Sequence, residues 1–252
     1  RPGRIHPRLD AVQQALGELG DPQRAFSSIL VVGTNGKGST AALLSSVLQA
    51  HGLRVGLYTS PHLVRVEERI RIGGAPLSSG QLDEHLRRLD DQPELTFFET
   101  LTVAALAAFG AADVDCAVLE AGMGGRWDAT RCADAMVAGL TNVGTDHRRW
   151  LGEGRTAIAR DKGSALAAAR LAVLGPGVDP DIRPHLGSPD AVPAAALVEL
   201  AAAGGDILEA CWGGARTRLR LPLAGHHQRD NLHLALALAL AAVRAGLLAD
   251  LD

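Results

Sequence analysis

The chain of 252 residues has little cysteine, few aromatic residues and no excess of either charge. Its three cysteines are too few and too scattered for a disulfide framework, so we expect a protein of the reducing cytoplasm. The formal net charge of −3 offers no basic face for nucleic acid. The longest apolar stretch, residues 232–248, is interrupted by His233 and Arg244, so no segment is expected to span a membrane. We expect a monomer whose partners are small molecules.

Short aliphatic runs alternate with glycine-rich turns and helices rich in Ala and Leu. We expect strands at 28–32, 54–58, 116–120, 136–140, 171–174 and 219–223, and helices at 40–51, 100–110, 155–169 and 227–248. Continuous aliphatic strands separated by helices indicate a parallel sheet covered on both faces, so the predicted fold class is α/β, doubly wound and mostly parallel. Residues 64–72 alternate before Gly73 and Gly74 and predict an exposed hairpin or flap. Residues 179–214 give no clear pattern.

The run GTNGKGST, residues 33–40, lies directly between the first predicted strand and the first predicted helix. This position suits a phosphate site, because glycines let backbone N–H groups approach the phosphates and a helix N-terminus adds partial positive charge. Lys37 is expected to reach the outer phosphates, and a hydroxyl of Ser39 or Thr40 to face Mg²⁺. The glycines are spaced more closely than in the ordinary Walker pattern. The alternative is a plain glycine-rich turn, which the lysine and the two hydroxyls disfavour.

Polar residues also follow three other predicted strands: Ser60 after the second, Glu120 after the third, and Asp146 and His147 after the fourth. Ligands of open α/β sheets bind at the carboxyl ends of strands, so a shared site is expected there. A hydroxyl, a carboxylate and an imidazole suit Mg²⁺ or Mn²⁺ bound together with nucleotide phosphates. The alternatives are a simple Ser-Pro turn, a helix cap or salt bridge for Glu120, and a structural or exposed His147. By residue type alone, Lys162 is a surface lysine.

Six segments of the sequence resemble the folylpolyglutamate synthase/dihydrofolate synthase family, within the Mur ligase superfamily, and they occur in the order found there. They are GTNGKGST, YTSPHLVRVEERIRI, LTFFE, LEAGMGGRWDAT, TNVGTDH and GHHQRDN. The resemblance implies an ATP-dependent amide ligase of folate biosynthesis and one-carbon metabolism. In such an enzyme a carboxylate of dihydropteroate or folate takes the γ-phosphate of ATP, and L-glutamate then displaces phosphate from the acyl phosphate.

The resemblance also implies roles for individual residues. The implied ATP-binding residues are Thr34, Asn35, Gly36, Lys37, Gly38, Ser39, Thr40 and Asn231, and the implied magnesium ligands are Ser60, Glu120 and His147. The implied catalytic residues are Lys37, His147 and Lys162, the last carried as a carbamate, which turns its cation into a carboxylate. The implied pterin contacts are Thr96, Phe97, Phe98, Glu99, Trp127, Asp128 and Ala129. An aromatic ring among them can stack on the pterin, with core packing as the alternative. ATP, Mg²⁺ and, as a candidate, K⁺ are the expected cofactors.

Two short segments depart from the family's motifs. Arg131 stands where the family usually has Asn, and DKGS at residues 161–164 replaces Glu-Lys-Ala-Gly. The family also has a second, C-terminal ligase domain. We therefore expect residues 1–252 to form the ATP-binding Mur ligase-type domain and that second domain to be absent from this sequence. The alternatives are a nucleotide-binding module without catalysis and a Mur-type ligase that acts on another carboxylate.

Overall fold

A twisted sheet of eight strands forms the centre of the computed structural model, which describes residues 8–92, 94–145, 154–221 and 223–247. The strand order is β4-β3-β2-β5-β1-β6-β7-β8. The strands are β1 (Ser27–Val32), β2 (Val55–Tyr58), β3 (Ile70–Ile72), β4 (Ala75–Pro76), β5 (Cys116–Glu120), β6 (Val137–Asn142), β7 (Leu171–Gly177) and β8 (Val192–Pro193). In this order, all neighbouring pairs from β2 to β8 are parallel, and the pairs β2–β3 and β3–β4 are antiparallel. The predicted mostly parallel α/β fold is confirmed.

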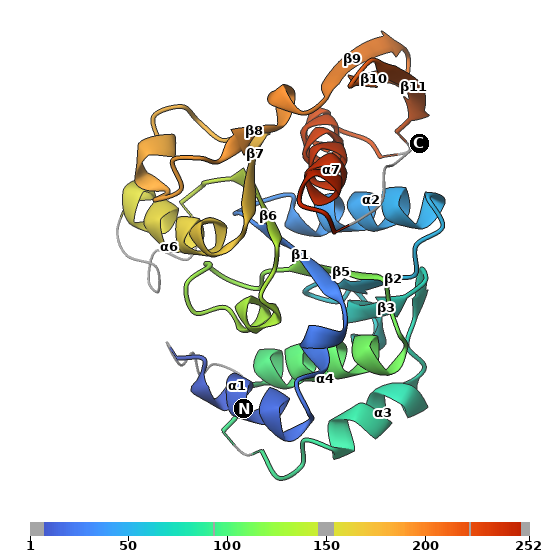
Figure 1. Cartoon of the computed structure of the whole chain (residues 1–252), viewed down its shortest axis with the longest axis vertical. Helices are drawn as coiled ribbons and strands as arrows, with labels where there is room; N and C mark the ends of the chain where they lie inside the picture. Colours follow the sequence, from blue (N-terminus) through green and yellow to red (C-terminus); the bar gives the residue numbers. More distant parts are fainter. Residues whose placement is uncertain (1–7, 93, 146–153, 222, 248–252) are drawn as a thin grey trace.

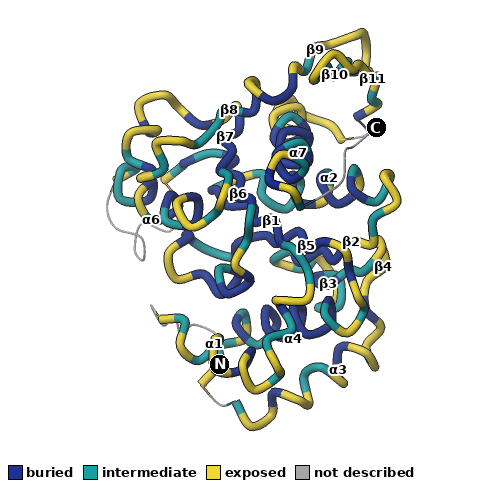
Figure 2. Tube along the Cα trace, in the orientation of Figure 1, coloured by how far each residue is buried: buried dark blue, intermediate teal, exposed yellow. Residues whose placement is uncertain are grey.

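Helices cover both faces of the sheet (Figure 1). They are α1 (Asp10–Glu18), α2 (Lys37–Ala50), α3 (Ser79–Arg87), α4 (Phe97–Ala111), α6 (Arg155–Ala168) and α7 (His226–Arg244). Alternate residues of β1 belong to two separate cores: Ile29 and Val31 pack with α2 and α7, whereas Leu30 and Val32 pack with α4 and α6. This is why the β1 run is aliphatic without interruption, and Figure 2 shows the central strands β1, β5 and β6 as mostly buried.

The predicted hairpin at residues 64–72 is wrong in its first half. Val66–Arg69 form a 3₁₀ turn, and only Ile70–Ile72 form a strand, which pairs with β2 and, across the two glycines, with β4. The carboxylate of Glu68 accepts the backbone N–H groups of Leu63, Val64 and Arg65 at 2.9–3.4 Å. Because one side chain gathers three consecutive N–H groups, this part of the chain coils instead of extending.

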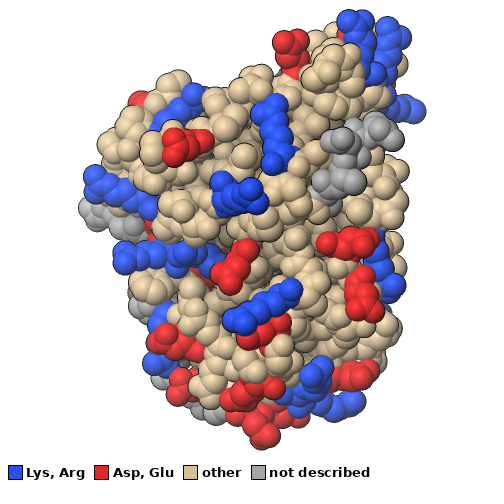
Figure 3. Space-filling view, viewed as in Figure 1, with Lys and Arg blue, Asp and Glu red and all other residues tan. Residues whose placement is uncertain are grey.

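The segment without a clear pattern, residues 179–214, contains β8 and most of a separate antiparallel sheet. That sheet is formed by β9 (Glu199–Gly204), β10 (Ile207–Trp212) and β11 (Ala215–Arg220), near the top of Figure 1. The strand predicted at 219–223 overlaps β11 only at residues 219 and 220. Figure 3 shows basic and acidic side chains interspersed over the face in view, with basic ones gathered over β10 and β11. Within the described ranges, no helix combines the length and apolarity needed to cross a bilayer.

Candidate active site

The phosphate loop occupies residues 33–36, between the end of β1 and the start of α2. Gly36 has φ +80°, and a Cβ atom there would lie 2.2 Å from Oδ1 of Asn231. A Cβ at Gly33 would lie 1.8 Å from Oγ1 of Thr141. Gly33 has φ +151°, so conformation and close contact both require glycine at Gly33 and at Gly36. The buried Asn231, at the start of α7, lies directly against the loop and donates Nδ2–H to Gln228.

The end of β6 holds the loop in place. The backbone N–H of Thr34 donates to the carbonyl of Asn142 at 3.1 Å, and the Oγ1 of Thr34 accepts the N–H of Gly144 at 2.9 Å. The N–H of Asn35 donates to Oδ1 of Asn142 at 3.1 Å. The ammonium of Lys37 donates to the carbonyl of Thr34 at 3.2 Å. The first part of the TNVGTDH segment therefore acts as a clamp on the phosphate loop.

Glu120 ends β5 and connects the phosphate loop with the end of β2. Its side chain is only 5% exposed, and Oε2 accepts the backbone N–H of Ser60 at 2.8 Å. A Cβ atom at Gly38 would lie 3.1 Å from the same oxygen, so the loop backbone packs directly on the carboxylate. Burial raises the pKa of Glu120, while the Ser60 N–H and the charge of Lys37 act to lower it. Glu120 forms no salt bridge within the described part of the chain, which leaves its charge available to a cation.

The donor set around Glu120 fits a magnesium ion shared with nucleotide phosphates. Ser60 and Glu120 lie together, and Oγ1 of Thr40, at the start of α2, is buried without a hydrogen-bond partner among the described residues. In residues that the structure describes, no three His, Cys, Asp or Glu side chains form a metal cluster. Magnesium usually needs only one or two carboxylates, because phosphates and water complete its octahedron. The other predicted ligand, His147, lies outside the described residues.

Lys162 is not a surface lysine, so the expectation from residue type alone is wrong. Its residue on α6 is 2% exposed, and Nζ donates to the carbonyl of Gly33 at 2.7 Å. Two glycines allow this approach: a Cβ at Gly125 would lie 2.9 Å from the Lys162 Cα, and one at Gly163 would lie 1.9 Å from the Leu186 carbonyl. The side chain of Lys162 therefore enters the site beneath the phosphate loop because α6 packs closely on both neighbouring segments.

A cavity of about 360 Å³ adjoins Ser60. Its walls are formed by Ser60, Pro61, Arg69, Thr96, Phe98, Glu99, Gly122, Met123, Trp127, Asp128 and Ala129. We call it the substrate cavity. Six of the seven residues that the family resemblance assigns to the pterin line it. The seventh, Phe97, does not: it is 51% exposed and lies under the guanidinium of Arg69, whose Cζ is 5.3 Å from the ring centroid.

Several side chains of the substrate cavity are held by contacts in the protein. Thr96 and Glu99 form the capping box of α4, so their polar atoms bind the helix backbone. The Phe98 ring lies against the backbone of Gly122, where a Cβ would approach it to 2.6 Å, and 5.9 Å from the Tyr58 ring. The buried carboxylate of Asp128 accepts the N–H groups of Met123 and Thr130, and burial raises its pKa. The cavity is thus preformed.

One residue of the cavity wall, Arg69, was not predicted from the sequence. Arg69 is buried, its Nε donates to Nδ1 of His62 at 2.9 Å, and it forms no salt bridge within the described part of the chain. A buried guanidinium without a carboxylate partner favours an anionic ligand. Three arginines, Arg65, Arg69 and Arg71, lie in the run VRVEERIRI. Nothing in that run distinguishes the buried arginine from the other two.

Comparisons with known proteins identify the family of the chain. Residues 31–167 match the model of the Mur ligase middle domain. The chain is 37% identical to the dihydrofolate synthase/folylpolyglutamate synthase of Mycobacterium tuberculosis, over 99% of this chain and 58% of that protein.

Two solved structures share the fold. The apo form of L. casei FPGS has 30% identity and a TM-score of 0.87, over 98% of this chain and 65% of that one. E. coli FolC in complex with DHPP and ADP has 32% identity and a TM-score of 0.83, over 100% of this chain and 61% of that one. The chain thus spans about three fifths of the length of these relatives. Since the matching model covers more than half of the sequence, the chain belongs to the Mur ligase middle-domain family.

Proposed function

We propose that this chain is the ATP-binding domain of an ATP-dependent amide ligase that joins L-glutamate to dihydropteroate, folate or both. The observation that carries the proposal is the contact chain from the substrate cavity to the phosphate loop. Ser60 lines the cavity, its N–H binds Glu120, and Glu120 lies against Gly38. A substrate bound in the cavity with its carboxylate at Ser60 would therefore hold that carboxylate next to the γ-phosphate of an ATP bound at the phosphate loop. The relatives named above are ligases of this type, and the E. coli protein binds DHPP and ADP.

The reaction has two steps. A carboxylate oxygen of the pterin substrate attacks the γ-phosphorus and ADP leaves; the amine of L-glutamate then attacks the acyl carbon, phosphate leaves and the nitrogen loses a proton. Both steps build negative charge beside the loop. Lys37 and the backbone N–H groups at the start of α2 stabilise that charge. Arg69, in the cavity wall, attracts the substrate's carboxylate toward the cavity. A magnesium ion bound at Ser60 and Glu120 would neutralise the phosphate oxygens.

The proposal includes a role for Lys162, which rests on the position of its side chain. Its nitrogen lies 2.7 Å from the Gly33 carbonyl, at the base of the phosphate loop, and is buried. A carbamate on this nitrogen would place a carboxylate at the base of the phosphate loop. We therefore include a carbamate at Lys162 in the proposal. A crystal grown with bicarbonate at neutral pH should show density for the added carboxylate, and density for an unmodified amine under these conditions would contradict it.

The proposed function is tested by a ligase assay. The chain is supplied with ATP, Mg²⁺, K⁺, L-glutamate and either dihydropteroate or folate, and the product and ADP are measured by mass spectrometry. The Lys37→Ala variant is the blank. Product above that blank supports the proposal and shows which pterin is used. ATP binding without product would favour the nucleotide-binding module, and product with another carboxylate alone would favour a different Mur-type substrate.

A further inference from the structure

The buried arginine of the substrate cavity, Arg69, is held by an uncharged side chain. Its Nε donates to Nδ1 of His62 at 2.9 Å. Because an arginine nitrogen can only donate, Nδ1 accepts this hydrogen bond, and the imidazole is neutral with its proton on Nε2. His62 is half-buried and is not part of the cavity wall, so it can act on a ligand there only through Arg69.

Two carboxylates precede Arg69 directly in the sequence, and both are engaged elsewhere. Glu68 accepts the backbone N–H groups of residues 63–65 at 2.9–3.4 Å. Glu67 is paired with the guanidinium of Arg65 at 3.0 Å. Arg69 itself forms no salt bridge with any residue that the structure describes. Its buried positive charge is therefore not neutralised by either neighbouring acid, and a ligand carboxylate would be a suitable partner.

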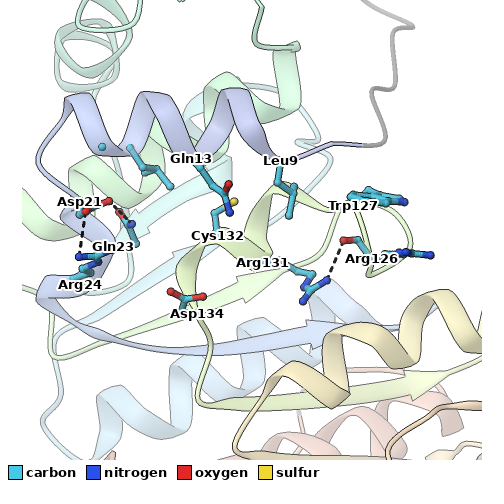
Figure 4. A pocket seen from close by; sticks show the side chains of 12 residues that line it. Leu9, Gln13, Asp21, Gln23, Arg24, Arg126, Trp127, Arg131, Cys132 and Asp134 are labelled. Atoms are coloured by element: carbon cyan, nitrogen blue, oxygen red, sulfur yellow. Dashed lines mark hydrogen bonds and ion pairs between the residues drawn. The ribbon is translucent and has the colours of Figure 1, made fainter.

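A neighbouring cavity shows an arginine that is held in a different way. This cavity, of about 540 Å³, lies between α1 and the segment 126–134 (Figure 4). There Nη1 of Arg131 donates to the backbone carbonyl of Arg126 at 3.1 Å, so a terminal nitrogen is used within the protein. The hydrogen bond from Arg69 to His62 uses Nε and neither of the Nη groups. Two Nη groups side by side can bind both oxygens of one carboxylate.

We propose that His62 is a positioning residue for the substrate's carboxylate and that it acts through Arg69. The imidazole fixes the guanidinium at Nε and directs its Nη groups to the substrate cavity. It adds no negative charge that would compete with the ligand. A carboxylate at residue 62 would hold the guanidinium equally well but would neutralise it. The proposal rests on the proposed function, because the anion in the cavity is taken to be the carboxylate of dihydropteroate.

Three substitutions separate this role from structural support. His62→Asn keeps an uncharged acceptor, because Oδ1 branches from Cγ as Nδ1 does; His62→Ala removes the acceptor; and His62→Asp keeps the acceptor but neutralises Arg69. In calorimetric titration with dihydropteroate we expect His62→Asn to bind within about twofold of wild type, and the other two variants about tenfold more weakly. His62→Asp should nevertheless melt at or above the temperature of His62→Asn. A purely structural role predicts instead that affinity follows melting temperature.

Two controls isolate the carboxylate of the ligand. The decarboxylated analogue of dihydropteroate should bind wild type and His62→Asp within about twofold of each other, because it has no anion for Arg69. Leu63 is 93% exposed and lies outside the cavity wall, so Leu63→Asp adds a nearby charge that does not reach the guanidinium. This variant should bind dihydropteroate within about twofold of wild type. Full affinity of His62→Asp for dihydropteroate, or an equal loss for the decarboxylated analogue, would overturn the proposal.

A second measurement needs no ligand. A hydrogen-bonded Nε–H exchanges slowly with water, so the NMR signal of the Arg69 Nε–H, assigned by its absence in Arg69→Gln, should persist in His62→Asn and His62→Asp. It should be lost in His62→Ala, and a signal that persists there would overturn the proposal. A wild type that binds ATP but no dihydropteroate would contradict the proposed function. In that case the signal still decides whether His62 holds the guanidinium.

Discussion

Replacing Glu120 with glutamine should have opposite effects on stability and on nucleotide binding. Glutamine keeps the length of the side chain and an oxygen that accepts the Ser60 N–H at 2.8 Å, but it removes the charge. The folded, ligand-free protein disfavours that charge, because the residue is 5% exposed and burial raises its pKa. Magnesium and phosphate chemistry requires the same charge. The substitution therefore separates the effect of the buried charge on folding stability from its effect on nucleotide binding.

The sign of the pH dependence follows from the raised pKa. The pKa of Glu120 is near 4.3 in the unfolded chain and higher in the folded protein. Below the lower of these values the protonated carboxyl contributes its full stability, and this contribution is lost as the pH rises through the pKa of the folded protein. Glutamine does not titrate. The free energy of unfolding of Glu120→Gln should therefore exceed that of the wild type by a margin that grows above about pH 4 and levels off above the folded pKa. We expect a margin on the order of 1 kcal/mol at pH 8.

Two measurements check this reasoning. Urea unfolding at pH 5 and pH 8, without nucleotide or divalent cations, gives the stability margin; calorimetry with ATP and Mg²⁺ gives the affinity. We expect Mg²⁺-dependent ATP binding to weaken by about 10- to 100-fold. Glu84→Gln, an exposed glutamate on α3, is the control and should change neither quantity. A variant that is less stable than the wild type at pH 8, or that keeps full Mg²⁺-dependent binding, would refute the reasoning.

Three further substitutions test other parts of the site. Lys37→Ala should abolish ATP turnover with an unchanged melting curve by circular dichroism, since the ammonium donates only one hydrogen bond to the described residues, to the loop carbonyl of residue 34; normal turnover would contradict the phosphate loop. Gly163→Ala should lower the free energy of unfolding by about 1–3 kcal/mol, because its Cβ would lie 1.9 Å from the Leu186 carbonyl. Gly80→Ala is the matched control, and an equal result for both would show that α6 is free to move. Arg69→Gln should weaken binding of dihydropteroate about tenfold in calorimetry and leave ATP binding unchanged; equal losses of both ligands would indicate a folding defect instead.

Local patterns in the sequence were sufficient for the doubly wound sheet and for the place of the phosphate loop. The uninterrupted aliphatic runs of β1 and β5 indicate strands that are buried on both faces of the sheet. A turn with glycines at residues 33 and 36 can be recognised without knowing what packs against it. The predicted start of α2 was three residues too late. The helix begins at Lys37, directly after Gly36, which has a left-handed backbone conformation. The strand β9 was not predicted, because its run ELAAAG is rich in Ala and Gly and carries little alternation of apolar and polar residues.

The sequence by itself determined the central parallel strands and the polar residues at their ends, because backbone preference and continuous apolar runs depend on near neighbours. Only the tertiary structure decided which charged side chains are buried. Lys162 lies in the site because Gly125 and Gly163 let α6 approach, and Arg69 is enclosed by residues from α4 and the end of β2. Burial is a property of what packs against a residue, and that partner is not encoded in the residue's own surroundings along the chain.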